Sequence, residues 1–256
     1  MEFECIIYQK EGGIAIIRLN RPKVLNAMNK QLWIDFQAAL QDAGGDPDIK
    51  VVIITGEGRA FSSGADLKES KHRTIEAYRD YLTELQEASR KIIRFEKPTI
   101  AAINGYALGS GYELALACDI RIADEEAAIG SPEAKVTSSV TGGAFRLVQQ
   151  LVGPGKAREL LFTAENINGK EAEQIGLVNK AVPAGLLMVE ARTMATKIAQ
   201  NSSFSLQMIK KGLNMAQGEV SMEALMDFEV EACLACVSTR ERQESLEAFE
   251  TRKKAK

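Results

Sequence analysis

Two glutamates of this chain stand where proton-transferring side chains are commonly found. Glu113 lies in ALGSGYELALACD (107–119), where glycine, serine and apolar residues surround it. Glu133 lies in SPEAK, after an interval of 20 residues (133 − 113). Because an apolar environment makes a carboxylate costly to ionise, such an acid tends to hold its proton. The pair therefore indicates general acid–base chemistry.

Both glutamates also fit an ordinary structural interpretation. The spacing of Ser110 and Glu113 matches a capping box, in which the serine caps a helix and the glutamate bonds back to the serine amide. Ser131, Pro132 and Glu133 match a helix start with a serine cap, a proline in the first turn and an acid favoured by the helix dipole. Spacing alone leaves both interpretations open.

Buried strands and loops of small residues must position the glutamates. IKVVIITGEG (49–58) is a continuous β-branched run closed by glycine, as expected for a buried strand, and the loop RAFSSGADLKES follows it. KPTIAAINGYALGSG (97–111) is likewise a strand-like run into a glycine loop, and the apolar helix YELALACDI (112–120), which carries Glu113, follows it. Two such loops with free amides, beside two carboxylates, suit oxyanion stabilisation. We expect an α/β fold of strand–strand–helix units, with a core at 1–195 and a helical region at 196–256.

Composition and charge argue against several classes of protein. The chain has 256 residues, enough for one large α/β domain or a core with a smaller appendage, and its formal net charge is −3. That charge gives no general attraction to nucleic acid. No uncharged apolar run is long enough to cross a bilayer, so we expect no membrane partner. The N-terminus, MEFECIIYQKEGG, lacks a signal pattern, and we expect a cytoplasmic protein.

Histidine and cysteine are too scarce for several other chemistries. His72 is the single histidine and lies in the charged stretch DLKESKHRTIEAYRD, where we expect a helix surface rather than a Ser-His-Asp triad. Of the four cysteines, Cys233 and Cys236 form one C-x-x-C pair inside a helical pattern. A zinc site would need a second pair of ligands, so we expect no metal site and buried, inert thiols.

Four stretches, in order along the chain, resemble the crotonase superfamily, also called the enoyl-CoA hydratase/isomerase family. They are LNRPKVLNAM (19–28), VVIITGEGRAFSSGADLKE (51–69), KPTIAAINGYALGSGYELALACDIRIA (97–123) and GPGKARELLFTAENINGKEAEQIGLVNKAVP (153–183). The resemblance implies a crotonase-type spiral of ββα repeats with a C-terminal helical oligomerisation region, and trimers or hexamers built as pairs of trimers. It also implies an acyl-CoA substrate and no cofactor, since coenzyme A is part of the substrate.

The same resemblance implies roles for four residues. The backbone amides of Ala65 and Ser110 would hold the thioester oxygen, although many relatives have glycine where Ser110 stands. Glu113 would act chiefly as the base on water, and Glu133 would deliver a proton to the α-carbon. The presence of both acids favours an enoyl-CoA hydratase, which adds water across the 2,3 double bond of a 2-enoyl-CoA to give a 3-hydroxyacyl-CoA.

The resemblance also implies where coenzyme A binds. Lys23 would lie near the phosphates, while Val24 and Leu25 would make backbone contacts. Asp66 and Leu67 would lie beside the adenine pocket. For Lys23, a solvated surface lysine is the alternative.

One loop departs from the family pattern. After the second glutamate, hydratases of the family usually continue with a proline-glycine loop that ends in GGTQRL. Here AKVTSSVTGGAFRL (134–147) follows, without proline and one residue shorter. Because this loop lies near the acyl end of the site in the family, other reactions stay open. They are enoyl-CoA delta-isomerisation, for which family members often rely on one acid, acyl-CoA hydrolysis, and a non-catalytic CoA- or RNA-binding role.

Overall fold

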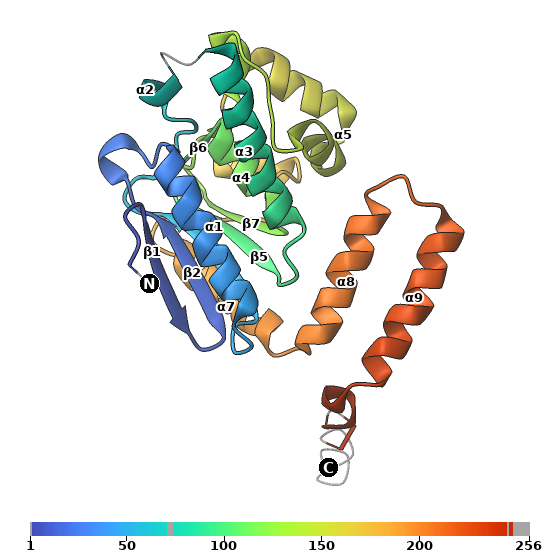
Figure 1. Ribbon diagram of the computed structural model, residues 1–256. Coiled ribbons are helices and arrows are strands. Elements are labelled where there is room, and N and C mark those ends of the chain that lie inside the picture. Colours follow the sequence, from blue (N-terminus) through green and yellow to red (C-terminus); the bar gives the residue numbers. More distant parts are fainter. Residues whose placement is uncertain (1, 71–73, 245, 248–256) are drawn as a thin grey trace. The chain divides into compact units, whose positions relative to one another are not determined.

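The computed structural model describes residues 2–70, 74–244 and 246–247 (Figure 1). His72, expected on a helix surface, lies outside these residues. The chain forms two compact units, residues 1–198 and 199–256. The division falls within helix α7 (Leu187–Ala199), the helix that also contains the boundary expected after residue 195.

A six-stranded sheet forms the centre of the first unit. Its strands, in spatial order, are β1 (Ile6–Glu11), β2 (Ile14–Leu19), β3 (Val51–Gly56), β5 (Thr99–Ile103), β7 (Ile120–Asp124) and β9 (Lys180–Val182). The first pair is antiparallel and all later pairs are parallel. Every residue of β3 and β5 is buried, as expected for β-branched runs in a sheet covered on both faces.

A second, three-stranded parallel sheet consists of short strands that lead toward the candidate site. They are β4 (Ala60–Ser62), β6 (Tyr106–Leu108) and β8 (Ile129–Gly130). In the pairs β3–β4, β5–β6 and β7–β8, the first strand joins the large sheet and the second joins the small sheet. A helix follows each pair, so the predicted succession of ββα repeats is confirmed.

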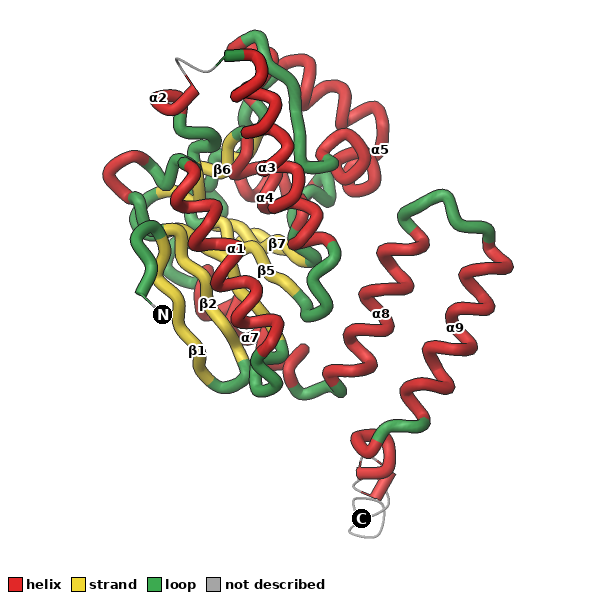
Figure 2. The backbone as a smooth tube through the Cα atoms, in the orientation of Figure 1, coloured by secondary structure: helices red, strands yellow, loops and turns green. Residues whose placement is uncertain are grey.

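Helices cover the sheets of the first unit (Figures 1 and 2). Besides α7, they are α1 (Lys30–Gly45), α2 (Leu67–Ser70), α3 (Ile75–Ile93), α4 (Ser110–Ala117), α5 (Ala144–Thr163) and α6 (Gly169–Gln174), with 3-10 turns η1 (Pro22–Val24) and η2 (Pro132–Val136). Helix α1 packs against β1, β2 and α3, and α3 also packs against α4. The hydrophobic core formed by these contacts consists mainly of aliphatic and aromatic side chains.

Helix α4, which carries Glu113, is buried along its whole length. The guanidinium of Arg121, on β7, donates to the Cys118 carbonyl over 2.7 Å at the C-terminal end of this helix. It also donates to the Leu177 carbonyl over 2.9 Å. A cation is favourable at a helix C-terminus, where unpaired carbonyls concentrate negative charge. Arg121 thus fixes one end of α4, and the loops of the candidate site hold the other.

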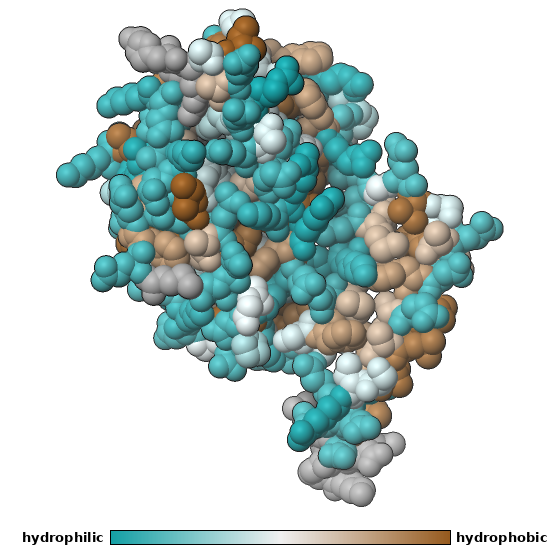
Figure 3. All heavy atoms as spheres, viewed as in Figure 1, coloured by the Kyte–Doolittle hydropathy of each residue, from teal (hydrophilic) through white to brown (hydrophobic). Residues whose placement is uncertain are grey.

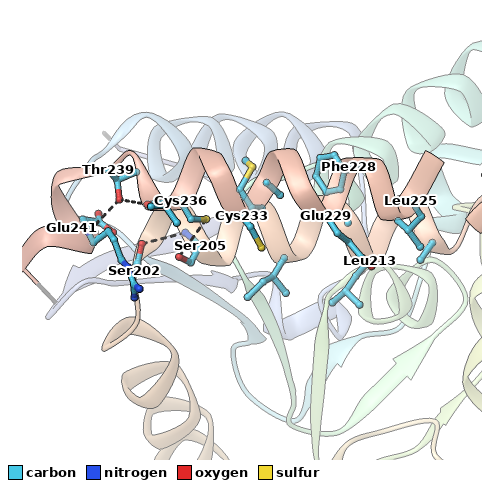
Figure 4. Close-up of a pocket in the computed structure, with 17 residues that line it drawn as sticks. Ser202, Ser205, Leu213, Leu225, Phe228, Glu229, Cys233, Cys236, Thr239 and Glu241 are labelled. Carbon is cyan, nitrogen blue, oxygen red and sulfur yellow. Dashed lines mark hydrogen bonds between the residues drawn. The ribbon is translucent and has the colours of Figure 1, made fainter. Parts of the chain in front are cut away.

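The second unit contains the helices α8 (Ser203–Ala216) and α9 (Met222–Val237), which pack against each other. Between them lies an apolar groove of about 590 Å³, with Leu213 of α8 and Leu225 and Phe228 of α9 on its walls (Figure 4). Apolar side chains also gather on the outside of these helices (Figure 3). On α9 a row of them is 55–70% exposed, namely Met222, Met226, Val230, Leu234 and Val237.

The cysteine prediction is correct for two thiols and wrong for the others. Cys5 and Cys118 are buried in the first unit. Cys233 is exposed and Cys236 is half-buried, because the second unit is too small to enclose both sides of α9. Among the described residues, no cluster of His, Cys, Asp and Glu is arranged to hold a metal ion. Nor, over the same residues, is any helix long and apolar enough to cross a membrane.

Candidate active site

The start of α4 presents a backbone amide, that of Ser110, which has no hydrogen-bond partner among the described residues. Gly109, with a φ of 52°, is the N-cap, and Ser110 is the first helical residue. The amide of a first helical residue has no partner within its helix, and it carries part of the positive end of the helix dipole. The capping-box interpretation of Ser110 is therefore wrong, because Ser110 is not the cap and no side-chain cap bond forms.

A second unpaired amide lies in the loop after β4. The Met28 amide donates to the Gly64 carbonyl over 2.8 Å, and the Asp66 amide donates to the Met28 carbonyl over 3.1 Å. These bonds clamp the residues on both sides of Ala65. Because successive amides of an extended segment point to opposite sides, the Ala65 amide points away from Met28. It donates no hydrogen bond within the described parts of the chain.

The two loops touch at glycines. Gly64 has a φ of +97°, and a Cβ on it would lie 2.8 Å from the Leu108 carbonyl oxygen and 3.4 Å from the Ser110 amide nitrogen. Any side chain at residue 64 would therefore separate the loops. The absence of a Cβ brings the segment of Ala65 against the segment of Ser110, so both free amides border one small region.

The side chain of Glu113 is buried, with 3% exposure, and both of its oxygens are bonded to Thr141. The Thr141 amide donates to Oε1, and the Thr141 hydroxyl donates to Oε2 over 2.7 Å. Burial raises the pKa of Glu113, the two bonds from Thr141 lower it, and the charge of Glu133 raises it, so the pKa lies above its ordinary value. Glu113 is thus a buried acid with a neighbouring acid, as the sequence predicts.

Glu133 lies in the 3-10 turn η2 and is half-buried. The hydroxyl of Ser131 donates to its Oε2. Its other oxygen, Oε1, would be 2.7 Å from a Cβ on Gly109, so this oxygen lies against the residue that precedes the free Ser110 amide. As expected, Ser131 is the N-cap of η2 and Pro132 and Glu133 follow in its first turn, but the Ser131 side chain makes no cap bond and η2 is a 3-10 turn rather than an α-helix.

The segments expected to bind coenzyme A lie side by side. The Ser63 amide donates to the Leu25 carbonyl over 2.9 Å, and the Arg21 guanidinium donates to the Asp66 carboxylate over 2.9 Å. Leu25 adopts a left-handed φ of 53°, which closes the turn η1 that contains Lys23 and Val24. Both of these side chains are exposed, as is Leu67, so they are free to contact a ligand.

Comparison with known proteins identifies the family. The model of the enoyl-CoA hydratase/isomerase family matches residues 9–256. The chain belongs to this family. It is 36% identical to the short-chain-enoyl-CoA hydratase of Clostridium acetobutylicum, over 99% of this chain and 97% of that protein. It is also 36% identical to the crotonyl-CoA hydratase of Syntrophomonas wolfei, over 100% and 98% of the two chains.

Solved structures agree with this membership. The enoyl-CoA hydratase of Bacillus anthracis superposes with a TM-score of 0.94, at 33% identity, over 97% of each chain. An enoyl-CoA hydratase subunit of Geobacillus kaustophilus superposes with a TM-score of 0.91, also at 33% identity, over 98% of this chain and 97% of that one. The expected crotonase fold is thereby confirmed.

Three partners of the site residues were not predicted from the sequence. Thr141 and Ser131 supply hydroxyls to the two glutamates, and Arg21 bonds to Asp66. A signal existed for Thr141, because it lies in the loop 134–147 that departs from the enoyl-CoA hydratase/isomerase pattern. Ser131 was assigned instead to helix capping, and Arg21 lies beside Lys23 in a stretch of the family resemblance without an assigned role.

Proposed function

We propose that this protein is an enoyl-CoA hydratase, which adds water to a 2-enoyl-CoA and forms a 3-hydroxyacyl-CoA. The observation that carries the proposal is the meeting of two glutamates with two unpaired amides in one region of the fold. Full-length relatives named short-chain-enoyl-CoA hydratase and crotonyl-CoA hydratase support the same reaction. Two intact acids favour hydration over double-bond isomerisation.

The amides of Ala65 and Ser110 would form an oxyanion hole. Attack of water on the β-carbon of a conjugated thioester builds negative charge on the thioester oxygen. Two preorganised N–H donors stabilise this charge more than they stabilise the neutral substrate, and losing one such donor typically costs about 10²–10³ in rate. The contact between Gly64 and the Ser110 segment supports the idea that one oxygen could reach both amides.

The two glutamates would move the protons. Glu113 takes a proton from the attacking water, and Glu133 gives a proton to the α-carbon. Because each charge affects the other, the two carboxyls would titrate as a coupled pair. Such proton transfers contribute about 10²–10⁴ in rate. This chemistry calls for no metal or redox cofactor, since charge is stabilised by amides and no electrons are transferred.

Coenzyme A would bind along the paired segments 21–28 and 62–67. In this proposal Lys23 contacts the phosphates, and the backbone of Val24 and Leu25 contacts the nucleotide. Asp66 and Leu67 border the adenine. The hydrogen bonds between the two segments support a preformed binding surface, which reduces the ordering cost of binding.

We also propose that the protein forms homo-oligomers through its second unit. The exposed row on α9, from Met222 to Val237, leaves apolar area in water that association would bury. Trimers, or hexamers built as pairs of trimers, are the assemblies that the family resemblance implies.

The proposed reaction is tested by mixing the purified protein with crotonyl-CoA. Enoyl-thioester absorbance and free thiol are followed together. We expect rapid loss of absorbance without release of thiol. Thiol release would identify a hydrolase. With no loss of absorbance, conversion of a 3-enoyl-CoA to a 2-enoyl-CoA would identify an isomerase, and binding without any turnover would identify a non-catalytic protein.

A further inference from the structure

One residue of the unusual loop bonds to both oxygens of Glu113. The Thr141 amide donates to Oε1 and the Thr141 hydroxyl to Oε2, across 28 residues of sequence. The side chain that receives these bonds is buried, so water competes little for it. Hydrogen bonds to a carboxylate are stronger than bonds between neutral groups. Thr141 therefore affects both the orientation and the protonation of Glu113.

The backbone around Thr141 is fixed by two glycines and a turn. Gly142 and Gly143 have left-handed φ values of 62° and 82°. A Cβ on Gly142 would lie 2.9 Å from the Ser89 hydroxyl and 3.3 Å from the Glu113 Cβ, so this glycine fits tightly between α3 and α4. The Ala144 amide donates to the Thr141 carbonyl over 2.9 Å as α5 begins. Thr141 is thus held against Glu113 by its neighbours.

We propose that Thr141 is the positioning residue that keeps Glu113 oriented and available as a base, an inference that rests on the proposed hydratase function. The amide can only donate, so it fixes Oε1 as an acceptor. The hydroxyl can donate to the carboxylate, or accept from the carboxyl once Glu113 has taken a proton from water. Thr141 can therefore hold the side chain in the same place through both protonation states.

The surroundings of Glu113 make this contribution decisive. Glu133, on η2, is the charged group that acts on Glu113, and Tyr112 is its titratable neighbour on α4. Helices α3 and α5 and strands β4 and β6 also pack against α4. Helix α3 presents the uncharged Ser89 at this point. Burial and Glu133 both oppose ionisation, and among the described residues only the two bonds from Thr141 favour it.

The hydroxyl is tested by comparing Thr141→Val with Thr141→Ser. Valine has the shape of threonine and keeps the amide but removes the hydroxyl, whereas serine keeps the hydroxyl. We expect Thr141→Val to reduce kcat/KM for crotonyl-CoA at neutral pH by about 10–100-fold, the usual effect of one bond to a charged group. The acidic limb of the pH profile should move to higher pH by about one unit. Thr141→Ser should keep kcat/KM and the pH profile close to those of the wild type. Ser139→Ala removes an exposed hydroxyl of the same loop and should change neither quantity.

A second readout separates this inference from the proposed reaction. The carboxyl carbon of Glu113 is titrated by NMR in protein carrying ¹³C-labelled glutamate, with Glu113→Gln used to assign the signal. We expect a higher pKa in Thr141→Val than in the wild type or Thr141→Ser. An unchanged pKa and pH profile in Thr141→Val, or a Thr141→Ser variant as impaired as the valine variant, would overturn the inference. If the wild type does not hydrate crotonyl-CoA, the proposed function fails and the titration still decides the role of Thr141.

Discussion

The guanidinium of Arg21 donates to the carboxylate of Asp66 over 2.9 Å, and this bond joins two segments that lie 45 residues apart. The same guanidinium donates to the carbonyl of Ala27. Along the chain, Arg21 lies two residues before Lys23, and Asp66 directly follows Ala65, whose amide is free among the described residues. Arg21 therefore couples the proposed binding surface for coenzyme A to the proposed oxyanion hole.

Replacing Arg21 with methionine should weaken both sites. We expect Arg21→Met to reduce CoA affinity about tenfold in calorimetric titration, since two segments would need ordering on binding. Burial raises the pKa of Asp66, but the hydrogen bonds from Arg21 and from the Lys68 amide outweigh this effect. The pKa of Asp66 therefore lies below its ordinary value. A carboxyl whose pKa is lowered by folding stabilises the protein at pH values above its pKa in the unfolded chain. This stabilisation is lost as the pH falls through the pKa of the folded state. The destabilisation by Arg21→Met should therefore fade in acid.

Arg192 provides a matched control for this prediction. It forms an ion pair with Glu11 over 3.1 Å, and the two side chains are 41% and 75% exposed. Ion pairs between such exposed side chains contribute little to the stability of a protein. Arg192→Met should leave CoA affinity unchanged, and equal losses in the two variants would contradict the role assigned to Arg21.

Adding a methyl group at Gly109 should disturb the site while the fold persists. Gly109→Ala would place a Cβ 2.7 Å from the Glu133 Oε1, at a backbone position with a φ of 52° and a ψ of −124°. We expect kcat/KM to fall by about 10²–10³, because Glu133 and the adjacent Ser110 amide must move. Gly12→Ala, with a φ of +57° and nothing within 4 Å of the new Cβ, controls for backbone strain. Equal activities of the two variants would refute the prediction.

The sequence predicts the strands of the core accurately. The predicted runs IKVVIITGEG and KPTIAAINGYALGSG contain β3 (VVIITG) and β5 (TIAAI). These runs are apolar without alternation, and the only stable place for such strands is inside a sheet covered on both faces. This apolar pattern lies within the strands themselves, so the strands can be predicted without knowing which elements pack against them.

The contacts of the glutamates could not be predicted in the same way. Local spacing suggests that Glu113 bonds within its own helix, but the side chain instead bonds to Thr141, 28 residues away. That contact depends on the course of a loop whose two left-handed glycines and shortened length have no periodic signal. A helix such as α9 shows the converse limit. The sequence predicts buried thiols on this helix, but Cys233 is exposed, and so are the apolar side chains of Val230 and Leu234.

The row on α9 should control self-association. Leu234→Asp places a charge within the exposed apolar row, where burial in an interface would be costly. We expect sedimentation equilibrium to give a multiple of the chain mass of 27.9 kDa for the wild type and a smaller assembly for this variant. Glu231 is an exposed acid of the same helix that does not belong to the apolar row, so Glu231→Lys should retain the wild-type mass. A wild-type protein that sediments as a monomer would end the oligomer proposal.

Replacing Glu113 with glutamine should lower activity and raise stability. Glutamine has the same shape and can keep both contacts with Thr141, accepting from the amide and donating to the hydroxyl. It cannot accept a proton from water, so hydration should fall by about 10²–10⁴ while CoA binding persists. Glu133→Gln should lose activity similarly. Near-wild-type rates in both variants would exclude a mechanism based on two carboxylates.

The gain in stability follows from the raised pKa of Glu113. Burial disfavours the ionised form, so the folded chain binds this proton more tightly than the unfolded chain does. The wild type is therefore most stable while Glu113 stays protonated, and it loses stability as the pH rises from the unfolded to the folded pKa. Glutamine removes that loss, so Glu113→Gln should melt a few degrees higher than the wild type at pH 8, about 2–4 °C for each 1 kcal/mol regained. The difference should shrink toward pH 5, and a constant difference across this range would show that ionisation of Glu113 costs the fold nothing.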